Sequence, residues 1–122
     1  MGWTDFCSTF APQSGPIRLG AFTSSRAGLG RFDFRATLAM SNTIAQYRTT
    51  ATGPVSALTQ MLAEAGINLE IRAFHQFREG GRTYTFALTE RRGRSKWAMG
   101  VGTDATESAC RAMIAGANRS LA

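Results

Sequence analysis

The chain has 122 residues, a net charge of +6 and an apolar fraction of 43%. This length suits one domain with a modest core, and the apolar content argues against a disordered chain. No apolar run is long enough to span a bilayer, and we find no secretory signal at the N-terminus, so we expect a cytoplasmic protein. The two cysteines, Cys7 and Cys110, show neither zinc nor disulfide spacing, so we expect no metal and no cofactor.

The basic residues are almost all arginines and are spread along the chain, with one run over residues 91–96. We interpret this run as a solvated hairpin turn, because no aromatic side chains that could stack on bases are interleaved with it. The prediction is therefore no nucleic-acid partner and no membrane partner. A steep loss of binding with salt would be needed to favour nucleic acid.

Residues 1–15 show no clear period and are interpreted as an N-terminal arm or linker remnant, with one short helical turn around Trp3 to Phe10. Alternating apolar residues then predict three strands, over residues 16–24, 32–40 and 44–52, with a turn over residues 25–30. In the first strand Ile17, Leu19 and Ala21 share one side. Gly53 and Pro54 end the third strand and open a helix over about residues 54–65.

The same pattern follows a second time. Strands are predicted over residues 67–77, 84–88 and 97–101, with turns over residues 78–81 and 91–94. A final helix is predicted over about residues 105–118, with Asp104 as N-cap and Glu107 completing a capping box. In this half Tyr84, Phe86 and Leu88 alternate, and we expect them to form the apolar face that the helix covers.

The sequence therefore predicts an α+β fold of two pseudo-repeated βββα units in a single domain over residues 16–122. Unit one covers residues 16–66 and unit two covers residues 67–122. One helix over three strands buries little apolar surface, so two units or two chains must pack together. We therefore expect a homodimer.

Four segments resemble a known family: Gly53–Leu58, Gly66–Ile71 followed by Phe74 and His75, Trp97–Gly102, and Ala117–Arg119. Over about residues 16–120 the chain resembles the C-terminal allosteric domain, which binds leucine and dimerises, of 2-isopropylmalate synthase and the related citramalate synthases. Residues 2–15 resemble the linker that precedes that domain. The resemblance implies a homodimeric module of leucine biosynthesis with an amino-acid-like effector bound between the units or near the dimer interface.

The resemblance also implies the residues of the effector pocket. N–H groups at the start of the first helix would hold a carboxylate, and apolar side chains would take the effector's side chain. The implied residues are Gly53, Pro54, Val55, Ser56, Ile71, Phe74, Gly81 and Thr83.

The catalytic barrel of the synthases, with its metal-binding residues, has no counterpart in these 122 residues. The chain is therefore either a regulatory domain that acts on a synthase catalytic domain, or a stand-alone small enzyme of specialised metabolism recruited from this fold. Such an enzyme would use the effector pocket as its active site for an amino-acid-like, 2-oxo or 2-hydroxy acid. Its catalytic candidates are His75, Tyr84, Arg78 and Arg82, although His75 is also interpretable as a structural histidine.

Overall fold

The computed structural model describes residues 15–121, and the possible helical turn around Trp3 to Phe10 lies outside these residues. Within the described part the predicted βββα-βββα order is confirmed. Unit one contains β1 (Ile17–Gly28), β2 (Arg31–Met40), β3 (Thr43–Ala51) and α2 (Pro54–Glu64). Unit two contains β4 (Glu70–Glu79), β5 (Arg82–Arg91), β6 (Arg94–Gly102) and α3 (Ala105–Leu121).

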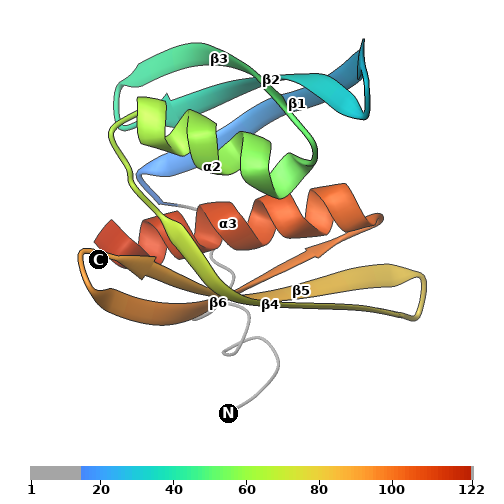
Figure 1. Cartoon of the computed structure of the whole chain (residues 1–122). Coiled ribbons are helices and arrows are strands. Elements are labelled where there is room, and N and C mark those ends of the chain that lie inside the picture. The colour runs from blue at the N-terminus through green and yellow to red at the C-terminus, as the bar shows by residue number, and fades with distance from the viewer. Residues whose placement is uncertain (1–14, 122) are drawn as a thin grey trace.

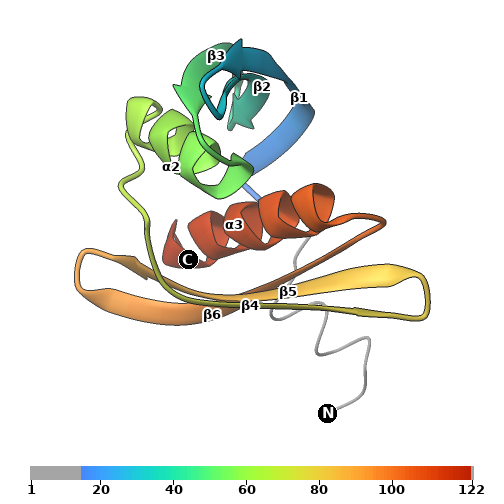
Figure 2. The ribbon, with the colours of Figure 1, turned by 45° about the vertical axis from the view of Figure 1, so that its right-hand side comes forward.

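Each unit folds its three strands into one antiparallel sheet. Sheet A has the order β1-β2-β3 and sheet B the order β4-β5-β6. The two helices lie between the sheets, α2 under sheet A and α3 on sheet B (Figure 1), and the turned view shows the same layers (Figure 2). Neither helix is long and apolar enough to cross a membrane.

The structure differs from the prediction at two strand boundaries and in one face of β1. The turn was expected over residues 25–30. Ser25 instead pairs with Asp33, β1 continues to Gly28, and only Leu29 and Gly30 form the turn. A β-bulge after Leu19 brings Phe22, in place of Ala21, into register with the buried Ala36. The fourth strand begins at Glu70 and not at residue 67, because the preceding segment anchors buried Ile67 and Leu69 in the core.

The main core lies between sheet A and the two helices. Phe34 and Leu38 of β2 meet Leu58 and Met61 of α2, and Met113 of α3 belongs to the same buried cluster. The helix of unit two therefore completes the core of unit one. This shared core agrees with the expectation that neither unit is stable alone.

Sheet B faces α3 with the opposite side from the one we predicted. The buried residues of β5 are Thr83, Thr85, Ala87 and Thr89, whereas Tyr84, Phe86 and Leu88 are only half-buried and lie on the outer face. The cause is the close approach of α3. A Cβ atom on Gly100 would collide with the α3 backbone at Ala112 and Ser108, so only small side chains fit between helix and sheet.

Polar contacts fix the C-terminal end of α3. The Asn118 side chain accepts a hydrogen bond from the Ile17 N–H and donates one to the Ile17 carbonyl, both at 2.9 Å. The basic run lies at the turn between β5 and β6, as predicted, and two of its members bind the end of the helix. Lys96 donates to the carbonyl of Arg119 at 2.9 Å, and Arg91 donates to that of Ser120 at 3.4 Å. Cations at a helix C-terminus stabilise it, so these two side chains have a structural role.

Candidate functional site

The start of α2 is an uncapped helix N-terminus. Gly53 is the N-cap, with an extended backbone (φ −161°, ψ 170°), and Pro54 is the first helical residue. The first backbone hydrogen bond at this end runs from the Ala57 N–H to the Gly53 carbonyl at 3.1 Å. No side chain among residues 15–121 caps this end, and its first turn contains no acidic residue. The N–H groups of Val55 and Ser56 therefore have no partner within the helix.

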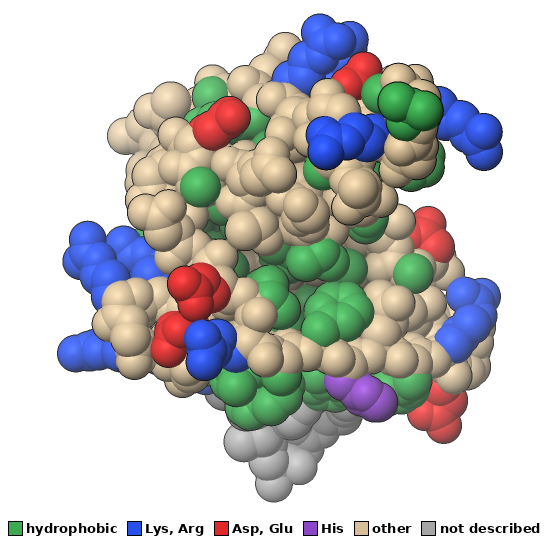
Figure 3. Space-filling model, in the orientation of Figure 1, with side chains coloured by type: hydrophobic (Ala, Val, Ile, Leu, Met, Phe, Trp, Pro, Cys, Tyr) green, Lys and Arg blue, Asp and Glu red, His purple; other side chains and the backbone are tan. Residues whose placement is uncertain are grey.

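A recess lies between this helix and β4. Figure 3 shows it as a hollow between the two layers, with hydrophobic side chains at its floor. Val55 and Ile71 both pack against the common core, and Phe74 remains 44% exposed on the inner face of β4, opposite Ala87. The resemblance implies that the helix start and these apolar side chains belong to one pocket.

The other two implied pocket residues lie at the far end of β4 and β5. Gly81 is in the hairpin turn, and Thr83 is buried near the segment that precedes α3. Arg78 joins these parts by donating to the Thr83 hydroxyl and to the Thr103 carbonyl, both at 3.4 Å. These contacts place Thr83 beside the start of α3.

The start of α3 is the counterpart of the α2 start in unit two, and it is capped. The Glu107 N–H donates to the Asp104 carboxylate at 2.8 Å, which confirms Asp104 as N-cap. The Glu107 carboxylate accepts from the Thr103 hydroxyl at 3.2 Å and pairs with Arg111 at 3.2 Å. It therefore does not return to the Asp104 N–H, as the predicted capping box required.

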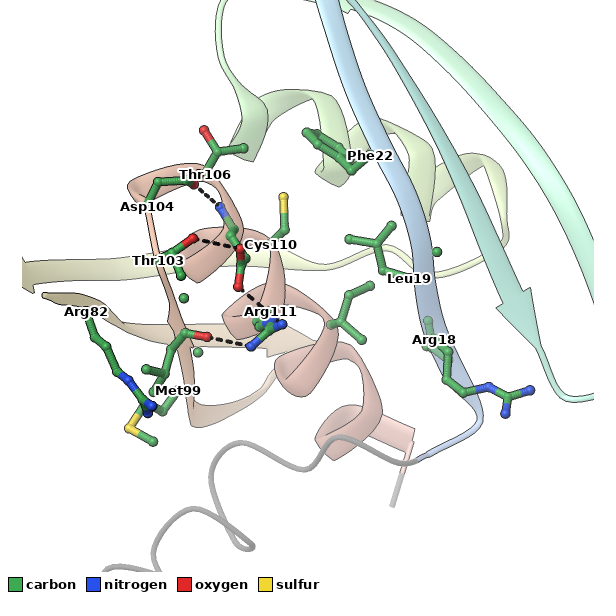
Figure 4. A pocket seen from close by; sticks show the side chains of 17 residues that line it. Arg18, Leu19, Phe22, Arg82, Met99, Thr103, Asp104, Thr106, Cys110 and Arg111 are labelled. Atoms are coloured by element: carbon green, nitrogen blue, oxygen red, sulfur yellow. Dashed lines mark hydrogen bonds and ion pairs between the residues drawn. The ribbon is translucent and has the colours of Figure 1, made fainter.

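A groove of about 950 Å³ separates this second helix start from β1. Figure 4 shows Leu19 and Phe22 of β1 on one side of the groove and the α3 residues on the other. Sequence reasoning missed this groove, although the spacing of Leu19 and Phe22 repeats that of Ile71 and Phe74. The equivalence is also structural, since β1 and β4 each carry a register shift at this point.

The two equivalent helix starts thus differ in one chemical respect. Carboxylates of the chain's own side chains occupy the N-terminus of α3, whereas the N-terminus of α2 has none. A helix N-terminus attracts negative charge through its N–H groups and its dipole. Of the two, the α2 start is the one open to a carboxylate from outside the chain.

The structure separates the four catalytic candidates. His75 pairs with Phe86 and therefore lies on the outer face of sheet B, opposite to the face that bears Phe74. The expectation that both face the pocket was wrong, because consecutive residues of a strand point to opposite sides. Tyr84 shares the outer face, Arg82 pairs with Glu79 at the hairpin, and Arg78 alone is on the inner face.

Cys110 borders the groove at α3 but is not a nucleophile. Burial, with a smaller contribution from the charge of Asp104, raises its pKa from 9.0 to about 12. The side chain is 3% exposed. The thiolate needed for nucleophilic attack is therefore scarce at neutral pH. Among residues 15–121 no group of three His, Cys, Asp or Glu side chains is placed to hold a metal ion.

No protein-family model matches the chain. Two curated proteins do, and both are 2-isopropylmalate synthases. The protein of Arthrobacter sp. (strain FB24) is 25% identical over 129 residues, which cover 98% of this chain and 22% of the relative. The protein of Thermobifida fusca (strain YX) is 26% identical over 121 residues, which cover 96% of this chain and 21% of the relative. The resemblance to these synthases is thus confirmed, and the chain spans about a fifth of their length.

Proposed function

We propose that this chain is a small-molecule-binding and homodimerisation domain of the kind that regulates 2-isopropylmalate synthase, and that it binds an amino-acid-like effector at the start of α2. The observation that carries the proposal is the difference between the two helix starts. In unit two the carboxylate of Asp104 caps the helix N-terminus. In unit one the N-cap residue is Gly53, which has no side chain to do so. The near-complete match of the chain to one fifth of the synthases supports it.

The recess suits a small carboxylic acid with an apolar side chain. The N–H groups of Val55 and Ser56 would donate to the carboxylate, and the helix dipole would favour its charge. Val55, Ile71 and Phe74 would contact the apolar part, since none of the three is completely buried. Gly53 leaves the approach open, because no atom of the described residues outside its immediate neighbours lies within 4 Å of where its Cβ would be.

Regulation requires a second site in a partner, because coupling is defined between two sites. The partner we propose is a synthase catalytic domain, either joined to this domain or supplied in trans. In this role the domain changes the activity of that partner when the effector binds, and it performs no chemistry itself.

The experiment is a thermal-shift and calorimetric screen of leucine, other amino acids and 2-oxo acids. A ligand that binds only the folded chain raises its Tm. Gly53→Asp should place a carboxylate at the N-cap of α2, as Asp104 does at α3, and should abolish binding while keeping or raising Tm. Gly53→Val should abolish binding by filling the approach. The extended backbone at Gly53 accepts either residue.

Thr52→Asp is the matched control, because it adds the same charge one residue before the N-cap on an exposed position. It should keep the affinity within a few-fold. If Gly53→Asp binds the ligand as tightly as the parent chain, the site is not at the α2 start. If no ligand in the panel raises Tm, the amino-acid-like effector class is wrong.

His75→Ala separates this function from the recruited-enzyme alternative. His75 lies on the other face of sheet B from the recess, so the binding domain should keep its ligand affinity. An enzyme that used His75 as acid or base should lose turnover by about 10²–10⁴-fold.

A further inference from the structure

Sheet A gathers on one face four arginines that are far apart in the sequence. Each of them is next in the chain to a residue of the common core, so its side chain points away from the helices. They are Arg18 of β1, Arg31 and Arg35 of β2, and Arg48 of β3, and all four are exposed. In Figure 3 basic side chains project from the upper layer of the molecule, which is formed by sheet A and α2.

This face has little negative charge of its own. Residues 15–52 contain five arginines and a single acidic residue, Asp33, which lies 4.0 Å from Arg48 and accepts a hydrogen bond from the Thr50 hydroxyl at 2.6 Å. Arg35 is directly opposite Arg48 in the strand register. Like charges at such positions repel each other. A bound anion between these two side chains would remove the repulsion.

Sheet B provides an internal comparison. Its Arg72 lies 3.5 Å from Glu70 and 3.6 Å from Glu90, and Arg82 is opposite Glu79. The βββα unit therefore does not by itself require an excess of arginines on its sheet.

The expectation of no nucleic-acid partner rested on the spread of the arginines along the sequence. The strand register removes that premise, because it brings them onto one sheet. A stripe of basic residues on one face of a protein with a net charge of +6 is the electrostatic signature of nucleic-acid binding.

We propose that the outer face of sheet A, together with the hairpin between β1 and β2, binds the phosphate backbone of duplex DNA without regard to its sequence. The side chains between the arginines include Thr23, Thr37 and Gln46, whose hydroxyl and amide groups are of the types that contact phosphates. From Arg31 to Ala39, the partner of Arg18, the face spans eight residue steps, which is about 26 Å at about 3.3 Å per residue. This length matches about 8 base pairs at about 3.4 Å each.

The hairpin adds an arm that can follow a groove. Residues 23–31 are exposed at every position, and the hairpin extends beyond α2 (Figure 1). Arg26 and Arg31 flank its tip, where Leu29 is fully exposed. The major groove of B-form DNA is wide enough for a two-stranded ribbon, whereas that of duplex RNA is too narrow. The arm therefore favours DNA over RNA.

The composition of this face disfavours other partners. Single-stranded nucleic acids stack on aromatic side chains, and protein interfaces have an apolar core enriched in them. The aromatic residues of sheet A all belong to the core side, namely Phe22, Phe32, Phe34 and Tyr47. Among the described residues, Ile44 is the one large apolar side chain exposed on the outer face. A duplex that is bound through its phosphates fits this face best.

The experiment measures the fluorescence anisotropy of a labelled 24-base-pair DNA of mixed sequence, titrated with the full chain at 50 to 200 mM KCl. The parent chain should bind with a dissociation constant in the micromolar range at the lowest salt concentration. Four or five phosphate contacts predict a slope of about −4 for log K against log salt, and a loss of affinity of about 200-fold over this range.

The double variant Arg35→Gln and Arg48→Gln removes two of these contacts. The slope should fall to about −2, and the affinity at the lowest salt concentration should fall at least about tenfold. Arg92→Gln with Arg94→Gln is the matched control, because it removes the same charge from exposed positions at the turn between β5 and β6. It should keep a slope of about −4. Circular dichroism and Tm check that both variants are folded.

Three results would overturn the inference. The first is no binding of the DNA at the lowest salt concentration. The second is the same slope for both double variants, which would mean that only net charge matters. The third is equal affinity for duplex RNA, for poly-L-glutamate or for phosphatidylglycerol vesicles, which would indicate an anionic partner of another class. Because the face is separate from the α2 start, a chain that binds an effector but no DNA overturns this inference alone.

Discussion

Asn118 connects the two units through a single side chain. Its carboxamide satisfies both the N–H and the carbonyl of Ile17, the first residue of β1, from the last turns of α3. Both residues are buried, so without this amide two backbone groups would be left without partners in the interior. Buried backbone groups without partners are costly, which explains an asparagine at this point of an otherwise apolar helix face.

We predict that Asn118→Ala lowers the free energy of unfolding by about 2–3 kcal/mol, because it leaves those two groups unsatisfied. Urea unfolding followed by circular dichroism measures this. Asn68→Ala, at an exposed position, is the control and should change the free energy of unfolding by less than about 0.5 kcal/mol. Equal effects at the two positions would contradict the bridging role of Asn118.

Because the pKa of Cys110 is raised in the folded chain, we predict that the free energy of unfolding falls at alkaline pH. Its pKa is about 12 in the folded chain against an ordinary value of 9.0, so above pH 9 the unfolded state loses the proton while the folded state keeps it. Stability is therefore full below pH 9 and falls between pH 9 and 12, by about 1.4 kcal/mol per pH unit.

The measurement is the difference in the free energy of unfolding between the parent chain and Cys110→Ala as a function of pH. The other titrating groups are common to both chains and cancel. The difference should be constant below pH 9 and shrink above it. A difference that stays constant up to pH 11 would show that the thiol ionises normally in the folded chain.

At the scale of elements, the contact between α3 and sheet B determines which side of the sheet is buried. Ser108 donates to the Gly100 carbonyl at 3.0 Å and lies 2.6 Å from the Thr85 hydroxyl. These short polar contacts require the helix backbone to approach the sheet closely. Large side chains are consequently excluded from the inner face and appear on the outer one.

We predict that Gly100→Ala lowers the free energy of unfolding by at least about 3 kcal/mol, because the added methyl group would overlap the α3 backbone. Gly20→Ala is the matched control in a strand of sheet A, where the added Cβ would meet Thr37 at an ordinary 3.4 Å. It should change the free energy by less than about 1 kcal/mol. If Gly100→Ala is equally mild, helix and sheet can separate without cost.

At the scale of the whole molecule, the two units should unfold together. Met113 and Ile114 of unit two belong to the same buried cluster as Phe34 and Leu58 of unit one. Separating the units would expose this cluster in both, so a state with only one unit folded would bury too little apolar surface to be stable.

We predict a single unfolding transition in urea. In a Trp3→Phe chain, Trp97 is the single tryptophan and its fluorescence reports on unit two, whereas far-ultraviolet circular dichroism reports on both units. The two probes should give the same midpoint. Phe34→Ala, in unit one, should shift both midpoints equally. An earlier fluorescence transition would mean that unit two unfolds independently.

Most elements of this fold could be predicted from the sequence, because alternation in strands and the spacing of apolar residues in helices are local patterns. The predicted turn over residues 25–30 was wrong because the polar residues Ser25 and Arg26 belong to a hairpin arm that extends beyond the core. The candidate site came mainly from the resemblance. Gly53 and Phe74 stay predicted members of this site, whereas Thr83 lies near the start of α3.

The sequence by itself determined the two repeated units, the helix start at Gly53 and Pro54, and the cap at Asp104, since each depends on residues close in the chain. Only the tertiary structure decided which side of sheet B is buried. Tyr84, Phe86 and Leu88 alternate with Thr83, Thr85, Ala87 and Thr89 in a way that fits either side. The decision comes from α3, whose close packing on Gly100 leaves no room for aromatic rings.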